Sequence, residues 1–157
     1  MTLDANVIDE AETDPMNRLG FLLARHGAIA NNQVRQAFAE CGLGPRQGTT
    51  LMLLGQSGAM AQQALAAKLQ VDASIMVGIL NELESSQFVE RRRDPSDRRR
   101  HIVAITDAGR DALAKARGAV SDVEQGLFGD LSPEEIAVLR GLLARIRTSH
   151  SDEACAE

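Results

Sequence analysis

The sequence contains no tryptophan and no tyrosine, and aromatic residues make up only 3% of the chain. A core must therefore be built from the leucine, isoleucine, valine, methionine and alanine that supply most of its hydrophobic residues, a composition that favours helices. A length of 157 residues suits one compact domain, with extra helices that can pair with a second copy. We expect a mainly helical fold.

Long hydrophobic runs are also missing. No apolar run approaches the roughly 20 residues that are needed to span a bilayer. The first residues, MTLDANVIDEAETDP, are acidic, whereas a secretory signal begins with basic residues and continues with apolar ones. These absences predict a cytoplasmic protein that has no membrane partner.

The residues that support enzymatic chemistry are scarce as well. No Gly-rich phosphate loop and no G-x-S-x-G nucleophile motif is present, so we expect no catalytic activity. Cys41 and Cys155 are too few and too far apart for a disulfide framework or a metal cluster. His26, His101 and His150 show no i, i+4 pairing, which argues against a zinc site. We expect neither a cofactor nor a metal.

The charged residues are unevenly distributed. The net charge of −5 disfavours a nucleic-acid partner, because phosphate repels an acidic protein. Residues 91–100, however, contain six arginines and two aspartates, a local charge of +4. Such a concentration of basic charge is what a nucleic-acid docking element requires, and the alternative is a solvated loop with no partner.

The N-terminal part of the chain predicts two helices. Residues 1–14 are acidic and aperiodic, and we expect them to be flexible, as we do the polar tail at residues 148–157. Asp14 and Pro15 predict the N-cap and the first position of a helix that runs to about Glu40. Pro45 opens a second, shorter helix, which glycines between positions 55 and 58 end.

The middle of the chain predicts a helix-turn-helix. Two short helices at residues 62–69 and 73–85 are joined by only three residues, and Asp72 is a suitable N-cap for the second. In the first helix we expect Ala64, Leu65 and Leu69 to face inward. In the second, a stripe at helical spacing predicts the core residues Met76, Ile79, Leu80 and Leu83.

The rest of the chain predicts a β-hairpin and two long helices. Strands at residues 88–92 and 101–105 enclose an eight-residue loop, which makes a wing. Thr106 caps a helix that ends at Gly129 and Asp130, and the residues from Ser132 to Glu135 form a capping box for a last helix. The apolar faces of the terminal helices exceed what a small core can cover, so we expect them to pack against a second chain.

The stretch VERRRDPSDRRRHIVAITDAGR resembles the MarR family of winged helix-turn-helix regulators. The family's D-x-x-D-R-R and L-T-x-x-G motifs are matched by Asp94, Asp97, Arg98 and Arg99 and by Ile105, Thr106 and Gly109. The resemblance covers roughly residues 19–147. It implies a homodimer that binds double-stranded DNA, with one domain at 15–147, a winged helix-turn-helix at about 45–105, and dimerisation helices at about 15–40 and 106–147.

The resemblance also implies how DNA is contacted. The helix from residue 73 enters the major groove, and the wing reaches the neighbouring minor groove, whose negative potential attracts arginine. Arg98 or Arg99 is the inserted residue, and Asp94 and Asp97 brace the wing by ion pairs. The predicted DNA-binding residues are Ser74, Ile75, Val77, Gly78, Asn81, Arg92, Arg93, Arg98, Arg99 and Arg100.

Two features depart from the family pattern. Gln70 occupies a turn position where relatives usually carry glycine, and a left-handed backbone there would cost on the order of 1 kcal/mol. The outward face of the recognition helix offers few side chains for bidentate bonds to purines. We therefore expect DNA readout to depend mainly on the wing and on DNA shape.

The resemblance further implies an effector pocket between the dimer helices and the DNA-binding lobe. We predict that His26, Arg46, Thr49 and Met52 line it, although a core or interface histidine remains the alternative for His26. An arginine beside apolar walls suits a small aromatic or aliphatic carboxylate. The leading interpretation is a ligand-responsive repressor that binds a pseudo-palindromic operator.

Three other functions stay open. The protein is alternatively a constitutive or architectural DNA-binding protein without an effector, or a thiol-based redox sensor that uses Cys41. The third alternative is a dimeric interaction protein that has lost DNA binding. For Cys41 itself, the competing interpretation is a small buried residue.

Overall fold

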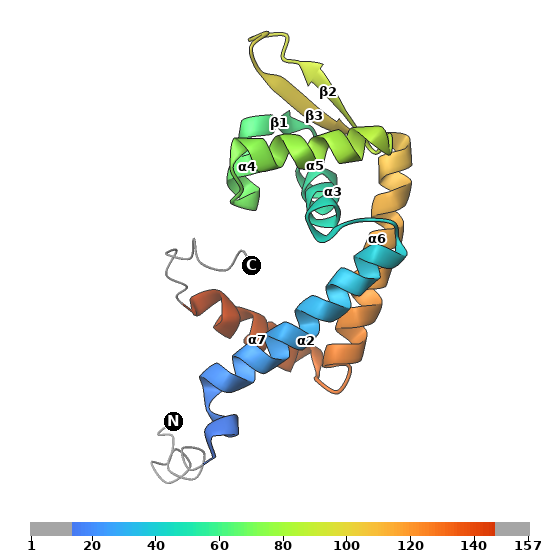
Figure 1. The fold of residues 1–157 in the computed structure, drawn as a ribbon. Helices are drawn as coiled ribbons and strands as arrows, with labels where there is room; N and C mark the ends of the chain where they lie inside the picture. Colours follow the sequence, from blue (N-terminus) through green and yellow to red (C-terminus); the bar gives the residue numbers. More distant parts are fainter. Residues whose placement is uncertain (1–13, 147–157) are drawn as a thin grey trace. The chain divides into compact units, whose positions relative to one another are not determined.

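The computed structural model describes residues 14–146, and these residues form a mainly α-helical fold with a small antiparallel sheet, as expected (Figure 1). The described residues fall into two compact units, one that ends at Val123 and one that begins at Glu124. The predicted end segments, apart from Asp14, and the residues Cys155 and His150 lie outside the described residues. In chain order the elements are η1 (Pro15–Asn17), α2 (Leu19–Glu40), α3 (Pro45–Ser57), β1 (Met60–Ala61), α4 (Gln62–Leu69), α5 (Ala73–Ser85), β2 (Val89–Arg93), β3 (His101–Ile105), α6 (Asp107–Phe128) and α7 (Pro133–Arg145).

The predicted start of the first helix is wrong by four residues. Asp14 does act as a cap, because its Oδ1 accepts a hydrogen bond of 2.9 Å from the backbone N–H of Met16. The element that it caps is the short 3-10 helix η1, and Arg18 then takes an extended conformation with ψ of 136°. The α-helical bonds of α2 therefore begin only at Leu19.

The core of the first unit is formed where α3, α4 and α5 meet the sheet and the start of α6. The predicted stripe of α5 is confirmed, since Met76, Ile79, Leu80 and Leu83 are all buried. In α4 the expectation for Ala64 is wrong. Ala64 is exposed, and Ala66 is buried beside Leu65 in its place, so the side of α4 that meets the core contains Leu65, Ala66 and Leu69.

The turn between α4 and α5 has the left-handed residue that the sequence suggested. Gln70 has φ of 54° and ψ of 42°, and it ends α4 without a glycine. Asp72 then caps α5 as predicted, with its Oδ1 accepting a bond of 2.9 Å from the N–H of Ile75. That bond, followed by the one from the Ser74 hydroxyl, holds the pKa of Asp72 below its usual range. The conformation of the turn therefore sets the direction of α5 relative to α4.

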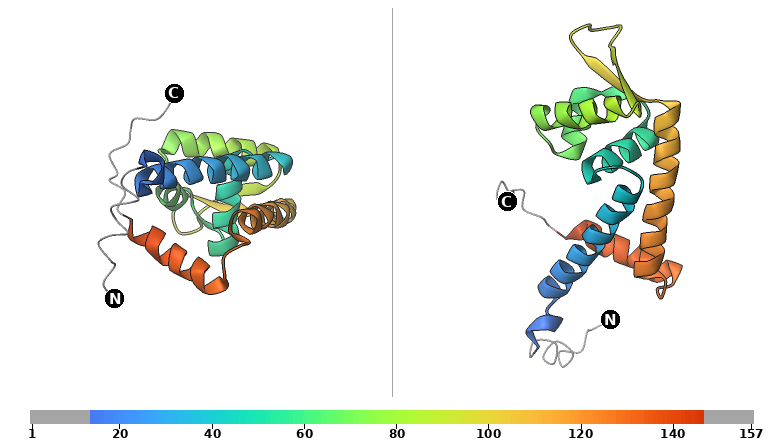
Figure 2. Two further views of the ribbon diagram at one scale, coloured as in Figure 1. Left: turned by 90° about the horizontal axis from the view of Figure 1, so that it is seen from below. Right: turned by 45° about the vertical axis from the view of Figure 1, so that its right-hand side comes forward.

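The sheet has three strands in the order β1, β3, β2, whereas the sequence predicted two. β1 contains only Met60 and Ala61, which is too short for an alternating pattern to indicate a strand, and it pairs with β3 through Val103 and Ile102. The long hairpin of β2 and β3 projects beyond α4 and α5 in Figure 1 and in the right-hand view of Figure 2. Its strand β2 begins one residue later than predicted.

The hairpin is tied to the start of α6 by the residues of the L-T-x-x-G motif. Thr106 Oγ1 donates to the carbonyl oxygen of Gln87 at 2.6 Å and accepts from the N–H of Gly109 at 3.0 Å. Its backbone N–H donates to the carbonyl oxygen of Phe88 at 3.1 Å. The threonine therefore caps α6 as predicted and also joins it to the turn that follows α5.

The second unit contains the capping box that the sequence indicated. Ser132 Oγ accepts from the N–H of Glu135 at 3.2 Å, and Glu135 Oε2 accepts from the N–H of Ser132 at 2.8 Å. No residue of the helix α7 is buried, and Val138, Leu142 and Leu143 are exposed. Between residues 14 and 146, no single helix is long and apolar enough to cross a membrane, and α4 and α5 pass that test only as a pair bent by 108°.

Candidate DNA-binding interface

The outward side of α5 carries the residues that were predicted to meet DNA bases. Ser74, Val77, Gly78 and Asn81 are exposed, whereas Ile75 is half-buried and packs against the core. The Ser74 hydroxyl donates to Asp72 Oδ1 at 2.7 Å, so it supports the N-cap of the helix. Of this set, Val77 is the large apolar side chain that α5 leaves exposed, at 39% of its surface.

Asn81 is engaged with a residue that sequence reasoning did not select. The Arg91 guanidinium, on β2, donates from Nη2 to Asn81 Oδ1 at 2.7 Å and to Glu84 Oε2 at 2.5 Å. The backbone N–H of Arg91 also donates to Glu84 Oε1 at 3.0 Å. No local pattern in the sequence distinguishes Arg91 from the other five arginines of the basic run, so its acceptors on α5 could not be predicted.

The loop of the hairpin is held by its own two aspartates. Asp97 pairs with Arg100, with Oδ2 and Nε 3.4 Å apart, and its Oδ1 accepts from the N–H of Arg99 at 3.0 Å. Asp94 instead accepts two hydrogen bonds from Ser96, at 2.8 Å from the backbone and 2.6 Å from the hydroxyl. These bonds, the hydroxyl's first, keep the pKa of Asp94 below its usual range. The ion-pair expectation thus describes Asp97, whereas Asp94 braces the loop by hydrogen bonds.

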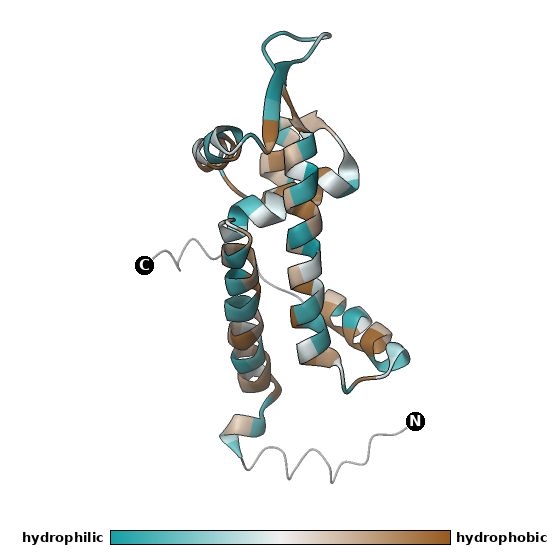
Figure 3. Ribbon diagram, turned by 90° about the vertical axis from the view of Figure 1, so that its right-hand side faces the viewer, coloured by the Kyte–Doolittle hydropathy of each residue, from teal (hydrophilic) through white to brown (hydrophobic). Residues whose placement is uncertain are grey.

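The arginines of the hairpin divide into engaged and free side chains. Arg92 pairs with Glu90, Arg100 pairs with Asp97, and Arg93 Nη1 donates to the carbonyl oxygen of Arg98 at 2.9 Å. The side chains of Arg98 and Arg99 are exposed, and neither has a hydrogen-bond or ion-pair partner within residues 14–146. The loop end of the hairpin is coloured hydrophilic and its base hydrophobic in Figure 3. Two exposed arginines without partners among the residues described therefore lie in the loop that joins β2 and β3.

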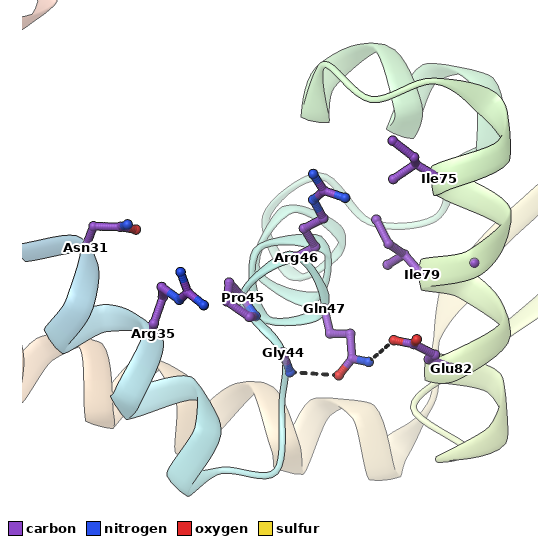
Figure 4. A pocket seen from close by; sticks show the side chains of 10 residues that line it. Asn31, Arg35, Gly44, Pro45, Arg46, Gln47, Ile75, Ile79 and Glu82 are labelled. Carbon is purple, nitrogen blue, oxygen red and sulfur yellow. Dashed lines mark hydrogen bonds between the residues drawn. The ribbon is translucent and has the colours of Figure 1, made fainter. Parts of the chain in front are cut away.

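A pocket of about 690 Å³ lies behind α5 (Figure 4). Asn31 and Arg35 of α2 stand on one side, the start of α3 lies between, and α5 forms the other side. Gln47 accepts from the N–H of Gly44 at 2.9 Å and donates to Glu82 of α5. The pocket is lined by Asn31, Arg35, Gly44, Pro45, Arg46, Gln47, Ile75, Gly78, Ile79 and Glu82.

The predicted effector residues are only partly brought together. Arg46 lines this pocket, and with Thr49 it also lines a smaller pocket of about 340 Å³ beside Leu69 and Val71. His26 is exposed on α2 and Met52 is half-buried against the core, and neither lines either of these two pockets. The structure adds Arg35, which the sequence did not indicate because it lies more than two turns beyond His26 on the same helix.

The described residues provide no evidence for a reactive thiol or a metal site. Cys41 is a free thiol at the C-cap of α2, half-buried and packed against the core. Its position matches a small packing residue. Among residues 14–146, no group of three or more His, Cys, Asp or Glu side chains is arranged to hold a metal ion.

Comparisons with known proteins agree with this arrangement. The model of the MarR family matches residues 43–101. A Thauera aromatica protein, named as a putative transcriptional regulatory protein for the hcr operon, is 33% identical over 85% of this chain and 81% of its own. CouR from Rhodococcus jostii RHA1 bound to p-coumaroyl-CoA is 31% identical over 80% of this chain and 89% of its own, with a TM-score of 0.71. The repressor CouR bound to a 23-mer DNA duplex is 30% identical over 92% and 97% of the two chains, with a TM-score of 0.74.

Proposed function

This chain belongs to the MarR family of DNA-binding transcriptional regulators, and from that premise we propose that it is a homodimeric, ligand-responsive repressor of a pseudo-palindromic operator. The observation that carries this proposal is the pair of free arginines at the end of a hairpin beside α5. The matched relatives are regulators rather than enzymes, and the activity proposed here is binding.

DNA contact is divided between helix and wing. α5 enters the major groove with Ser74, Val77 and Asn81 facing the base edges, and the loop of the hairpin reaches the adjacent minor groove. The side chains of Arg98 and Arg99 have no hydrogen-bond or ion-pair partner among the described residues. They can therefore bind phosphates or the floor of the groove without breaking an existing ion pair. Arg92, Arg93 and Arg100 are engaged, so they support the wing and contribute less to binding.

A second copy of the chain covers the apolar faces of the terminal helices. On α2, Leu19 is 85% exposed, and Phe21, Leu23 and Ile29 are also largely exposed. On α7 no side chain is buried. Large apolar side chains exposed on each of two helices favour an interface with another protein surface. A symmetric dimer then presents two copies of α5 to successive major grooves on one side of the duplex.

The effector is a small aromatic or aliphatic carboxylate that binds in the pocket behind α5. Arg35 and Arg46 face this space without an ion-pair partner in the described part of the chain, and the pocket volume lies in the range of small-molecule sites. Ile75, Gly78 and Ile79 form its α5 wall. A ligand there touches the recognition helix directly, so it can favour a conformation in which the two helices no longer fit the operator.

Two experiments test this proposal. Selection of bound genomic fragments at fixed salt should recover a pseudo-palindrome, and failure to retain any fragment at low salt would overturn DNA binding. A panel of aromatic and aliphatic carboxylates should then raise the melting temperature. Arg46→Gln should reduce that increase, whereas Lys115→Gln, which removes the same charge from α6, should not. A melting temperature that no carboxylate raises would overturn the carboxylate effector and favour the alternative of a constitutive DNA-binding protein.

A further inference from the structure

A small polar cluster connects the recognition helix to the hairpin. The Arg91 guanidinium bonds to both Asn81 and Glu84 of α5, and Glu84 also accepts from the Arg91 backbone. The side chains of Arg91 and Glu84 are only 23% and 31% exposed. Within the described residues, the side-chain hydrogen bonds and ion pairs that join α5 to the hairpin all involve Arg91.

The cluster lies where it can influence the orientation of the hairpin relative to α5. Asn81 and Glu84 are three residues apart, so both project from one face of α5. Arg91 is the middle residue of β2 and pairs with Val103 of β3. Beyond Arg93 the polar side chains of the loop bond mainly to one another, as in the contacts of Asp94 with Ser96 and of Asp97 with Arg100. Val89 and Val103 pack in the same core as the buried face of α5, and Arg91 adds the polar link between α5 and the hairpin.

We propose that Arg91 is a positioning residue for DNA binding: held by Glu84 and Asn81, it fixes the wing relative to α5 so that both reach neighbouring grooves together, without contacting DNA itself. This inference rests on the proposed DNA contacts of α5 and the wing. It assigns different roles to arginines of one basic run, since Arg98 and Arg99 contact DNA whereas Arg91 orients them.

The physical basis is effective concentration. Once α5 occupies the major groove, binding of the wing to the minor groove is an intramolecular step. A wing that is already held at the right angle loses little conformational entropy in this step, whereas a loosely held wing loses more and binds less tightly. The charge of the Arg91 guanidinium is balanced by the Glu84 carboxylate. The hydrogen bond from Arg91 in turn holds the pKa of Glu84 below its usual range. The pair therefore stays ionised at neutral pH and contributes geometry in place of net charge.

The chain offers a matched pair of variants. Glu84→Gln and Glu90→Gln each remove one negative charge and each weaken one ion pair with a β2 arginine, but Glu90 pairs with Arg92 within the strand and not with α5. The probes are two duplexes that carry the genomic site recovered by selection. The long duplex includes the flanking minor-groove steps, and the trimmed duplex ends before them.

We expect wild-type protein to bind the long duplex more tightly than the trimmed one. Glu84→Gln should bind the long duplex about ten-fold more weakly and the trimmed one almost unchanged. Its salt dependence on the long duplex should stay close to wild type, because every phosphate contact remains in place. Glu90→Gln should bind both duplexes at least as tightly as wild type. Arg91→Lys, which keeps the charge but replaces the rigid, planar guanidinium with an ammonium on a flexible stem, should reproduce the Glu84→Gln pattern.

Several outcomes would overturn the inference. Equal behaviour of Glu84→Gln and Glu90→Gln, or an equal loss on both duplexes that reflects general unfolding, would remove the positioning role. A salt slope that falls by about one unit per protomer in Arg91→Ala would show that Arg91 itself contacts phosphate. Equal wild-type affinity for the two duplexes would instead overturn the proposed wing contact, and this inference with it.

Discussion

Gly109 lies so close to Phe88 that a β-carbon at Gly109 would stand 2.0 Å from the carbonyl oxygen of Phe88. This close approach brings the start of α6 against the turn between α5 and β2, where Thr106 also bonds. The glycine of the L-T-x-x-G motif is therefore explained by the proximity of two backbone segments. Its φ is not in the left-handed region, so conformational freedom is not the reason.

Gly109→Ala should lower the free energy of unfolding by about 1–3 kcal/mol, because the backbone at Phe88 must move to make room. Gly118→Ala, on the same helix with no heavy atom within 4 Å of its added carbon, should raise it by up to about 1 kcal/mol. Urea denaturation measures both. Equal effects of the two substitutions would contradict the close approach.

Arg98→Ala and Arg99→Ala should weaken DNA binding and flatten its salt dependence. Removing one phosphate contact reduces the slope of log K against log salt by about 0.9, and each substitution removes one from both protomers of a dimer. Arg110→Ala, which removes the same charge from an arginine paired with Asp107 on α6, should leave the slope unchanged. Titrations of one duplex at several salt concentrations measure this. Unchanged slopes in both wing variants would remove the wing from the mechanism.

Leu23→Glu should make the protein monomeric and weaken its binding to the operator, because a charge would enter the apolar face that we assign to the dimer. Ala67→Glu introduces the same charge at an exposed position of α4, outside the helices that we assign to the dimer, so it should leave the dimer intact. Sedimentation at several protein concentrations distinguishes these results. A dimeric Leu23→Glu protein would place the interface elsewhere.

Gln87→Gly should stabilise the fold by about 1 kcal/mol, since Gln87 has φ of 60° and glycine reaches this region without the cost of a β-carbon. The neighbouring Ser86→Gly provides the control. Ser86 has φ of −83°, so glycine there only adds freedom to the unfolded chain and should destabilise the protein. Thermal unfolding compares the two variants, and a loss of stability in Gln87→Gly would count against a strained turn.

The ion pair of Glu84 and Arg91 should make stability depend on pH on the acid side. The pKa of Glu84 is lowered in the folded state, chiefly by its hydrogen bond from Arg91. The stabilisation is therefore fully present above the ordinary glutamate pKa and is lost as the pH falls through the lowered one. The difference in unfolding free energy between wild type and Glu84→Gln should shrink over that interval. A constant difference would show that the pair contributes no pH-dependent stability.

The elements that the sequence predicted well are those that local signals specify. The helices at residues 62–69 and 73–85 have the expected bounds, and the caps at Asp72, Thr106 and Ser132 form the expected bonds. The start of α2 was predicted wrongly because Asp14 caps a 3-10 helix. An aspartate N-cap can precede either a 3-10 helix or an α-helix, so the cap residue alone does not distinguish them. β1 was missed because two residues carry no periodic pattern.

Sequence alone determined the order of the α-helices, the helix-turn-helix and the basic hairpin, because periodicity, capping and turn chemistry act between residues a few positions apart. Tertiary structure alone decided which arginines are committed and which are free, and it placed Ile75 and Gly78 in the wall of a pocket. Arg91 and Arg98 are the same side chain in the same basic run. They differ only in whether folding brings an acceptor from another element within reach, and no local pattern records that distance.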